Sequence, residues 1–263
     1  MRNPQSLSCY SRVKRTEYNT RPIWNSDYVF EAYVGDRSGS MRSMGQGPSN
    51  STRQFIETKR NKAKKGQSKY HLTCVTFDDK SSTVFSKDAS KISEKDISLA
   101  IESMKPRGMT RFIDTAYEVL QDIMEQVRKK RRTFNRETCS LLPSISVSVA
   151  FLTDGQDNMS TRIPRELGEL ISVLEGREFN GTVVFMGANM DAIKMGNSFG
   201  IKAGNCIDFS TNSDGIENVV RCATQALERA SSGGDASFNA LERTQSQRVS
   251  PSIVRRGNGL VRC

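Results

Sequence analysis

Three oxygen-bearing side chains stand at every second position of one short stretch, at Asp36, Ser38 and Ser40. Side chains at alternate positions of an extended turn project to one side, so the three can present their oxygens to one point. Gly39 between them has no Cβ to crowd that point. Ligation by oxygen alone suits a hard divalent cation, especially Mg²⁺, which binds in an octahedral shell at about 2.0–2.1 Å. This stretch supplies half of such a shell.

Two later stretches offer the missing oxygens. Thr110 stands directly before a long segment of helical period, and Asp154 closes a strongly apolar run, FLTDG. In open α/β sheets, ligands bind outside the carboxyl ends of the strands, where loops lead into helices. We therefore predict that Thr110 and Asp154 join the three residues of the first stretch in one cation site.

The elements that must position these residues alternate along the chain. Short β-branched and aromatic runs alternate with longer segments of helical period, which is typical of βαβ units and a mainly parallel sheet. The predicted strands are 28–34, 71–77, 82–86, 144–152, 182–188 and 205–210. The predicted helices are 51–64, 93–104, 111–130, 162–176, 190–200 and 215–230. A polar turn at Asp78 and Asp79 predicts an antiparallel hairpin of the second and third strands at one sheet edge. The fold class is a three-layer α/β/α sandwich, doubly wound around a mainly parallel six-stranded sheet with one antiparallel edge strand.

The two ends of the chain differ from its middle. Residues 1–26 are polar and basic, residues 230–263 are rich in Ser, Gly and Arg, and neither segment shows a period. We predict flexible tails there and one domain over residues 27–229. Within that domain Glu31 interrupts the first apolar strand, so it needs a partner or an edge to water.

The order of the motifs resembles a known family. D-x-S-x-S, then Gly-x-Thr at a helix start, then an apolar strand closing in Thr-Asp-Gly is similar to the von Willebrand factor type A (VWA) domain with its metal-ion-dependent adhesion site (MIDAS). The resemblance covers about residues 27–229. It implies that Ser38, Ser40 and Thr110 supply hydroxyls to the ion, while Asp36 and Asp154 bind it directly or through water. The ion expected is Mg²⁺, with Mn²⁺ or Ca²⁺ as alternatives.

The donor types indicate what such an ion would do. Two carboxylates face it and the hydroxyls add no further charge, so the ion keeps an open, electrophilic position for an external carboxylate. We predict a protein–protein interaction through an Asp or Glu of the partner, and no enzymatic activity. The sequence has no GxSxG elbow, P-loop or paired carboxylates in a common motif. A metal-assisted hydrolase is a weaker alternative, because no general base accompanies the ion.

The basic balance of the chain supports a second hypothesis. The formal net charge is +10, with 39 Lys and Arg against 29 Asp and Glu. One basic run consists of Arg128, Lys129, Lys130, Arg131 and Arg132. It is either a solvated helix end favoured by the helix dipole or an anion-binding, nucleic-acid-binding or nuclear-import patch. The alternative function is thus nucleic-acid association through the basic tails and loop, with the domain as scaffold. We rank it lower because no aromatic-rich RNA-binding motif interleaves with the basic runs.

Composition also bears on the cellular setting. No run of about 18 apolar residues occurs, the N-terminus lacks the apolar core of a secretory signal, and the six cysteines form no CxxC pair. We expect no membrane insertion, reduced thiols in or near the core, and an intracellular protein, cytoplasmic with the nucleus as the alternative.

Overall fold

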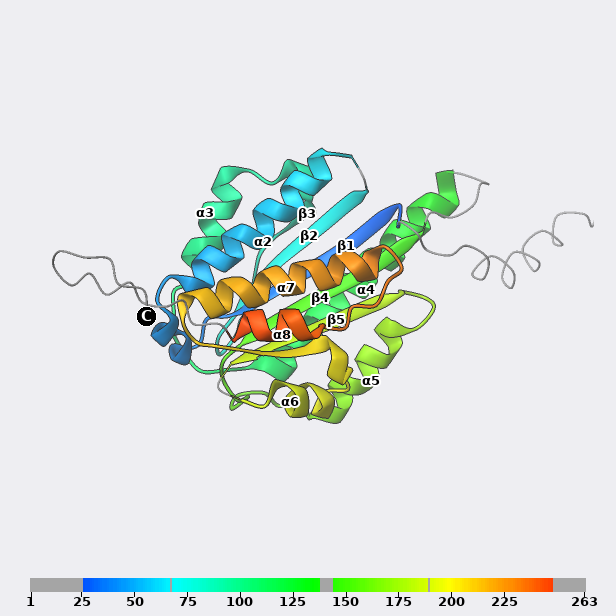
Figure 1. Ribbon diagram of the computed structural model, residues 1–263. Coiled ribbons are helices and arrows are strands. Elements are labelled where there is room, and N and C mark those ends of the chain that lie inside the picture. Colours follow the sequence, from blue (N-terminus) through cyan, green and yellow to red (C-terminus); the bar gives the residue numbers. More distant parts are fainter. Residues whose placement is uncertain (1–25, 67, 138–143, 189, 248–263) are drawn as a thin grey trace, which may run out of the picture.

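Figure 1 shows the computed structural model, which describes residues 26–66, 68–137, 144–188 and 190–247. Six strands form one sheet in the order β3-β2-β1-β4-β5-β6. Their bounds are β1 Tyr28–Asp36, β2 Lys69–Phe77, β3 Ser81–Asp88, β4 Ile145–Thr153, β5 Gly181–Ala188 and β6 Cys206–Phe209. All neighbours are parallel except β2 and β3, which are antiparallel. The predicted fold class and the edge hairpin are confirmed.

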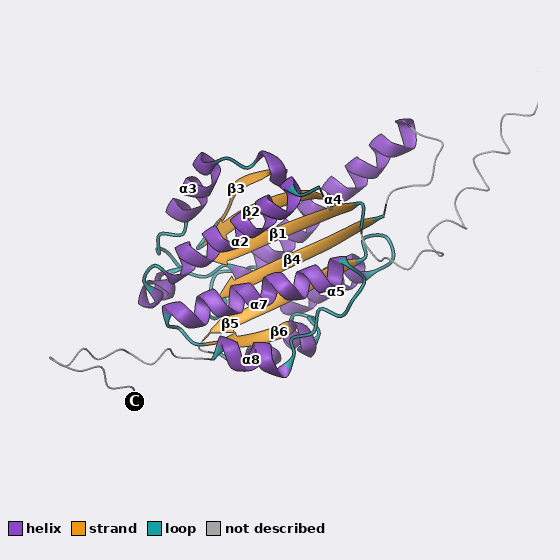
Figure 2. Cartoon of the chain, turned by 45° about the horizontal axis from the view of Figure 1, so that its top comes forward, coloured by secondary structure: helices purple, strands orange, loops and turns teal. Residues whose placement is uncertain are grey.

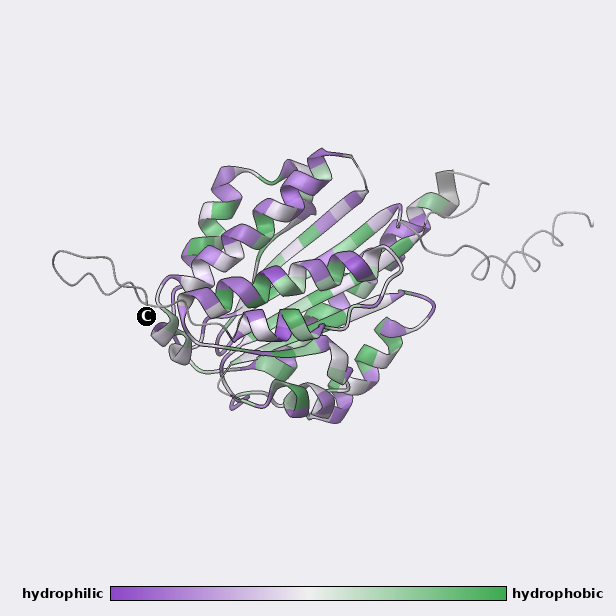
Figure 3. Cartoon of the chain, in the orientation of Figure 1, coloured by the Kyte–Doolittle hydropathy of each residue, from purple (hydrophilic) through white to green (hydrophobic). Residues whose placement is uncertain are grey.

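Helices cover both faces of this sheet (Figure 2). Their bounds are α2 Gly47–Lys64, α3 Glu94–Ser103, α4 Phe112–Glu137, α5 Pro164–Glu175, α6 Ala192–Ser198, α7 Ser213–Ser231 and α8 Ala240–Ser246. One core cluster joins the sheet to α2, α3 and α7, and the other joins it to α4, α5 and α6. Figure 3 shows hydrophobic and hydrophilic stretches alternating along α2 and α7, as expected for helices with one buried face. Within the described residues, no helix is long and apolar enough to cross a membrane.

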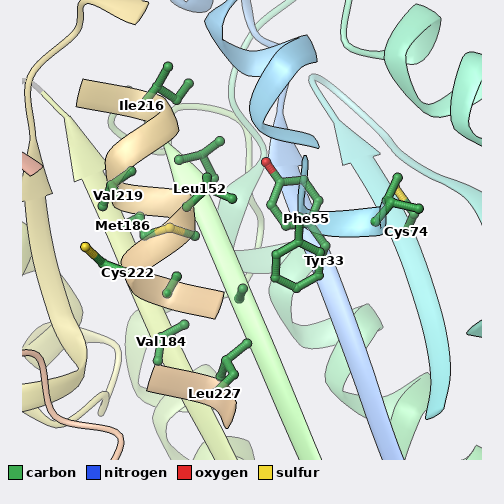
Figure 4. Close-up of a cluster of buried hydrophobic side chains, with 14 of the residues drawn as sticks. Tyr33, Phe55, Cys74, Leu152, Val184, Met186, Ile216, Val219, Cys222 and Leu227 are labelled. Carbon is green, nitrogen blue, oxygen red and sulfur yellow. The ribbon is translucent and has the colours of Figure 1, made fainter. Parts of the chain in front are cut away.

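The first cluster shows how the helices are held (Figure 4). Tyr33 of β1 packs against Phe55 of α2, with ring centroids 4.9 Å apart. Cys74 and Cys222 are free and buried in the same cluster, and Cys206 is free and buried in the other. The prediction of reduced core thiols is confirmed for these three residues.

Glu31 in β1 has a buried partner. Lys59 of α2 places its Nζ 2.9 Å from Oε1 of Glu31, and the side chains are 1% and 2% exposed. Burial raises the pKa of Glu31, and the nearby ammonium group of Lys59 offsets this only in part. Lys59 also lies 3.8 Å from Glu228 of α7. The ion pair therefore connects the central strand to both helices above it.

The prediction of a flexible tail from residue 230 is wrong for residues 230–247. The helix α8 lies within this segment and begins with a reciprocal capping box between Asn239 and Glu242. Arg229, at the end of α7, forms an ion pair with Glu242 at 2.7 Å. The remaining parts of the two predicted tails, residues 1–25 and 248–263, lie outside the described residues.

Polar side chains attach α8 to the edge strand β6. Arg243 donates from Nη1 to the carbonyl of Cys206 at 2.8 Å, and Ser246 donates from Oγ to the carbonyl of Asp208 at 2.7 Å. The polar residues that predicted a tail therefore bind backbone carbonyls of the edge strand β6. Such carbonyls need a hydrogen-bond partner when they are buried.

Candidate metal site

The predicted oxygen donors gather at the carboxyl ends of β1 and β4. Asp36 is the last residue of β1, and Asp154 directly follows β4, the strand paired with it. Ser40 donates from Oγ to Oδ1 of Asp154 at 2.6 Å, and the hydroxyls of Ser38 and Ser40 are 3.0 Å apart. Both carboxylates are buried, while Ser40 is exposed. The group therefore opens to solvent on its serine side.

Asp36 is fixed from two sides. Its Oδ1 accepts from the backbone N–H of Ser38 at 2.6 Å, and its Oδ2 accepts from Oγ1 of Thr153 at 2.6 Å. Asp154 is satisfied on one oxygen only: its Oδ2 is buried and has no hydrogen-bond partner among the described residues. A buried acceptor without a donor is costly, so this oxygen is the one best placed to accept a cation or a further hydrogen-bond donor.

Thr110 joins the same group through Gly155. A Cβ added to Gly155 would lie 3.0 Å from Oγ1 of Thr110 and 3.5 Å from Oγ of Ser40. The two hydroxyls thus approach the same side of Gly155, where a Cβ would fit only tightly. The structure brings all five predicted residues together.

The electrostatics of the site is unfavourable without a cation. Burial raises the pKa of Asp36 to about 6, with a smaller contribution from the charge of Asp154. Burial likewise raises the pKa of Asp154. Neither carboxylate forms an ion pair within the described residues. No group of three or more His, Cys, Asp and Glu side chains suited to a metal occurs in the described part, so a metal here depends on hydroxyl donors.

Sequence reasoning missed an arginine–carboxylate clamp beside the site. Arg37 and Arg107 place their Nε atoms 3.0 and 2.7 Å from the same Oδ2 of Asp78. Asp78 was predicted only as a turn residue, and it does accept from the N–H of Lys80 at 3.1 Å. The clamp holds the loop of residues 105–111 against the end of β1. No spacing in the sequence indicates it, because the three residues come from three separate loops.

The loop after Asp154 is bonded to the loop that carries Thr110. The N–H of Thr110 donates to Oδ1 of Asn158 at 3.0 Å, and the N–H of Asn158 donates to the carbonyl of Thr110 at 3.0 Å. Asp157 accepts from the N–H of Ile113 at 2.6 Å, at the start of α4. Asp157 thus caps the N-terminal end of α4, and the exposed Asn158 positions Thr110.

Asp114 completes this connection and supports a first testable prediction. Its buried carboxylate accepts from the N–H groups of Thr161 and Arg162 at 3.0 Å each. Burial alone would raise its pKa, but these bonds and Arg111 lower it to about 2. A carboxyl with a lowered pKa stabilises the fold above its unfolded pKa, and that stability is lost as the pH falls toward 2. Asp114→Asn should therefore lower the free energy of unfolding by about 2 kcal/mol at neutral pH.

Urea unfolding between pH 7 and pH 3 checks this. The difference between wild type and Asp114→Asn should shrink as the pH falls. Asp122→Asn, an exposed carboxyl on the same helix, is the control and should show little difference at any pH. A constant difference between wild type and Asp114→Asn would contradict the assigned role.

The predicted basic patch lies away from these residues. Arg128 to Arg132 stand near the C-terminal end of α4, whereas the site lies at that helix's N-terminal end. Arg128 pairs with Glu178 at 2.9 Å and Arg132 with Glu125 at 3.3 Å. The patch is therefore a separate surface.

The fold and the arrangement of oxygen donors define a class of α/β domain with a candidate cation site at the carboxyl edge of its sheet. A sequence model of the von Willebrand factor type A domain matches residues 32–194, and the chain belongs to this family. A search of curated proteins found no match.

Three solved structures illustrate the fold. A von Willebrand factor type A protein from Catenulispora acidiphila has a TM-score of 0.51 and 18% identity, over 76% of this chain and 42% of that one. The pilus adhesin SpaC from Lactobacillus rhamnosus GG has a TM-score of 0.50 and 11% identity, over 78% of this chain and 30% of that one. Proximal thread matrix protein 1 from the mussel byssus has a TM-score of 0.49 and 20% identity, over 77% of this chain and 46% of that one. Its structure is described with a zinc-occupied MIDAS motif. The chain thus spans less than half of each, and at these identities the likeness shows the fold alone.

Proposed function

We propose that this VWA domain is a binding module that holds one divalent cation, Mg²⁺ by preference, and uses it to grip an Asp or Glu side chain of a protein partner. The ligands would be Asp36, Ser38, Ser40, Thr110 and Asp154. The unpartnered, buried Oδ2 of Asp154 beside a second buried carboxylate carries the proposal, because a dication would satisfy the first and neutralise both. Family membership supports it.

The residues present fit this ion. Two carboxylates and three hydroxyls are the hard oxygen donors that Mg²⁺ prefers, and Mg²⁺ sites in proteins usually leave part of the shell to water or ligand. When bound, the cation would supply an electrophilic centre for an external carboxylate. The chain's own residues orient the donors, and Ser40 stands on the exposed side, where a partner would approach.

We propose a binding module and not an enzyme because the described residues at the site offer no base apart from the ligand carboxylates. The single histidine, His71, lies near the start of β2, at the opposite end of that strand, and its Nε2 is 2.9 Å from the Oγ of Ser86. General acid–base chemistry needs a titratable group within hydrogen-bond reach of the reacting atoms.

Calorimetric titration with Mg²⁺ and Mn²⁺ tests the proposal. Wild type should bind one ion, and Asp36→Asn should bind none in the measurable range because it removes one of the two charges that face the ion. Asp122→Asn makes the same chemical change at an exposed position of α4 and should bind as wild type does.

Each titration should be repeated with acetate in excess, which stands in for the partner's carboxylate. Equal binding by Asp36→Asn and wild type would refute the assigned ligands. No binding in any protein, with or without acetate, would refute the metal site. Partner capture that survives both chelation and Asp36→Asn would refute the metal-bridged mechanism.

A further inference from the structure

A second charged surface lies at the end of the domain opposite the candidate metal site. We call it the basic pole; it consists of Lys64, Lys65, Lys69, Arg128, Lys129, Lys130, Arg131 and Arg132. Helix α4 has 26 residues and β1 has 9, or about 39 Å against about 30 Å. The last turns of α4 therefore project past the sheet, as Figure 2 shows.

Contacts join three elements into this one surface. Lys69 starts β2 beside Tyr28 of β1, and its Nζ donates to the Tyr28 hydroxyl at 3.0 Å. From α4, Lys130 places its Nζ 4.9 Å from the ring centroids of both Tyr28 and Phe134. Helix α2 ends at Lys64, a few residues before β2 begins, so its C-terminus lies at the same end of the sheet.

Positive charge predominates at the pole. Among the described residues, Asp27 and Asp88 lie near Lys69, Glu125 and Glu178 lie near Arg128, and Glu125 also pairs with Arg132. Lys64, Lys65 and Lys129 are exposed, and none of them forms an ion pair with another described residue. These three ammonium groups are available to an external anion. The helix dipole accounts for cations at one helix end, but it does not account for their meeting from two helices and a strand.

We propose that the basic pole binds the phosphodiester backbone of a nucleic acid. The cations lie on both sides of the sheet, since α2 belongs to one helical layer and α4 to the other. Such a surface curves around the end of the domain, which suits a flexible polyanion better than a flat bilayer.

None of the eight pole residues is apolar, whereas a surface that enters a bilayer presents large apolar side chains beside its cations. Of the large exposed apolar side chains in the described residues, Met109, Met159 and Ile163 lie at the metal-site end of the sheet.

The geometry also indicates the mode of binding. Lys130 lies over the rings of Tyr28 and Phe134, so these rings are not free platforms for bases. Contacts to phosphates carry no sequence information and depend steeply on salt. Binding should therefore be independent of sequence. It should also be independent of any ion at Asp36 and Asp154, because the length of the sheet separates the two sites.

Fluorescence anisotropy of the full chain with labelled single-stranded RNA, single-stranded DNA of the same sequence, and a DNA duplex tests the proposal. The pole variant carries Lys64→Gln, Lys65→Gln and Lys129→Gln. The control variant carries Arg42→Gln, Lys80→Gln and Lys105→Gln, which remove the same charge from exposed or partly exposed positions at the other end of the domain. Because the net charge of the two variants is equal, any difference between them belongs to the pole.

With single strands, the pole variant should flatten the slope of log K against log salt by about 2, since each neutralised phosphate contributes about 0.7. The same relation gives a loss of affinity of roughly 10- to 100-fold at about 0.1 M salt. The control variant should change the slope by much less, and chelator should change nothing. Comparison of RNA, DNA and duplex shows which source of phosphodiester is preferred.

Equal losses in the two variants would overturn the proposal, because net charge alone would then explain binding. Binding to phosphatidylserine vesicles without binding to any oligonucleotide would also overturn it, in favour of a membrane surface. Loss of oligonucleotide binding on chelation would place the contact at the other end of the domain. None of these outcomes affects the metal titration, so the two proposals fail separately.

Discussion

Lys59→Met should lower the free energy of unfolding by about 3–5 kcal/mol near neutral pH. The variant keeps the length of the side chain but leaves Glu31, which is 2% exposed, as a buried carboxylate without its cation. Its Oε2 already has no hydrogen-bond partner among the described residues, so nothing replaces the ammonium group. Glu31 will respond by taking up a proton. Because its pKa is already raised by burial, the loss should become smaller as the pH falls.

A double variant separates the cost of an unpaired charge from the value of the pair. Glu31→Leu with Lys59→Met replaces both ions by apolar side chains and should recover most of the lost stability, since buried pairs replaced together are often neutral or stabilising. Urea unfolding of the two variants and wild type measures this. A single variant within about 1 kcal/mol of wild type would show that water reaches the pair.

Phe112→Ala should lower the free energy of unfolding by about 3–5 kcal/mol, the usual cost of a large cavity in a core. Phe112 is 2% exposed, and its ring centroid lies 5.0–6.1 Å from four other phenylalanine rings. These are Phe77, Phe151, Phe185 and Phe199. It is also the first residue of α4, two positions after Thr110.

The substitution should therefore affect the candidate metal site as well as the core. We expect Phe112→Ala to weaken Mg²⁺ binding under conditions where it remains folded, because the loop that carries Thr110 loses its anchor. Phe112→Leu, which fills most of the space, should cost less than half as much stability and keep the affinity for the ion. Equal stability of Phe112→Ala and wild type would show that the neighbouring rings close the gap.

The helices and strands could be predicted from the sequence because each one buries its own apolar residues at the period of its own secondary structure. The strands 144–152 and 182–188 correspond to β4 and β5, which are buried on both faces along most of their length, as expected in the middle of a parallel sheet. The residues Val119, Leu120, Ile123 and Val127 mark the buried face of α4. At the start of α3, Ser93 and Asp96 have the Ser-x-x-acid spacing of a capping box and form one.

The five candidate ligands could be predicted because they stand next to element ends, where the sequence itself fixes their place. Their supports could not. Asp78 receives two arginines from different loops, and Asp114 bonds to a loop 47 residues further along the chain. Such contacts depend on tertiary geometry and leave no period in a single sequence. Lys59 is a similar case, because a lysine on an amphipathic helix ordinarily faces solvent.

The contacts between α8 and β6 have a consequence for where the folded unit ends. A short edge strand with free carbonyl groups is a template on which another chain can add a strand. Here Arg243 and Ser246 occupy two of those carbonyls. A polypeptide that ends at residue 229 would keep all six strands of the sheet. It would lack α8, however, so β6 would be exposed and could pair with a strand of another chain. The segment up to residue 247 therefore belongs to the domain, because it covers this edge of the sheet.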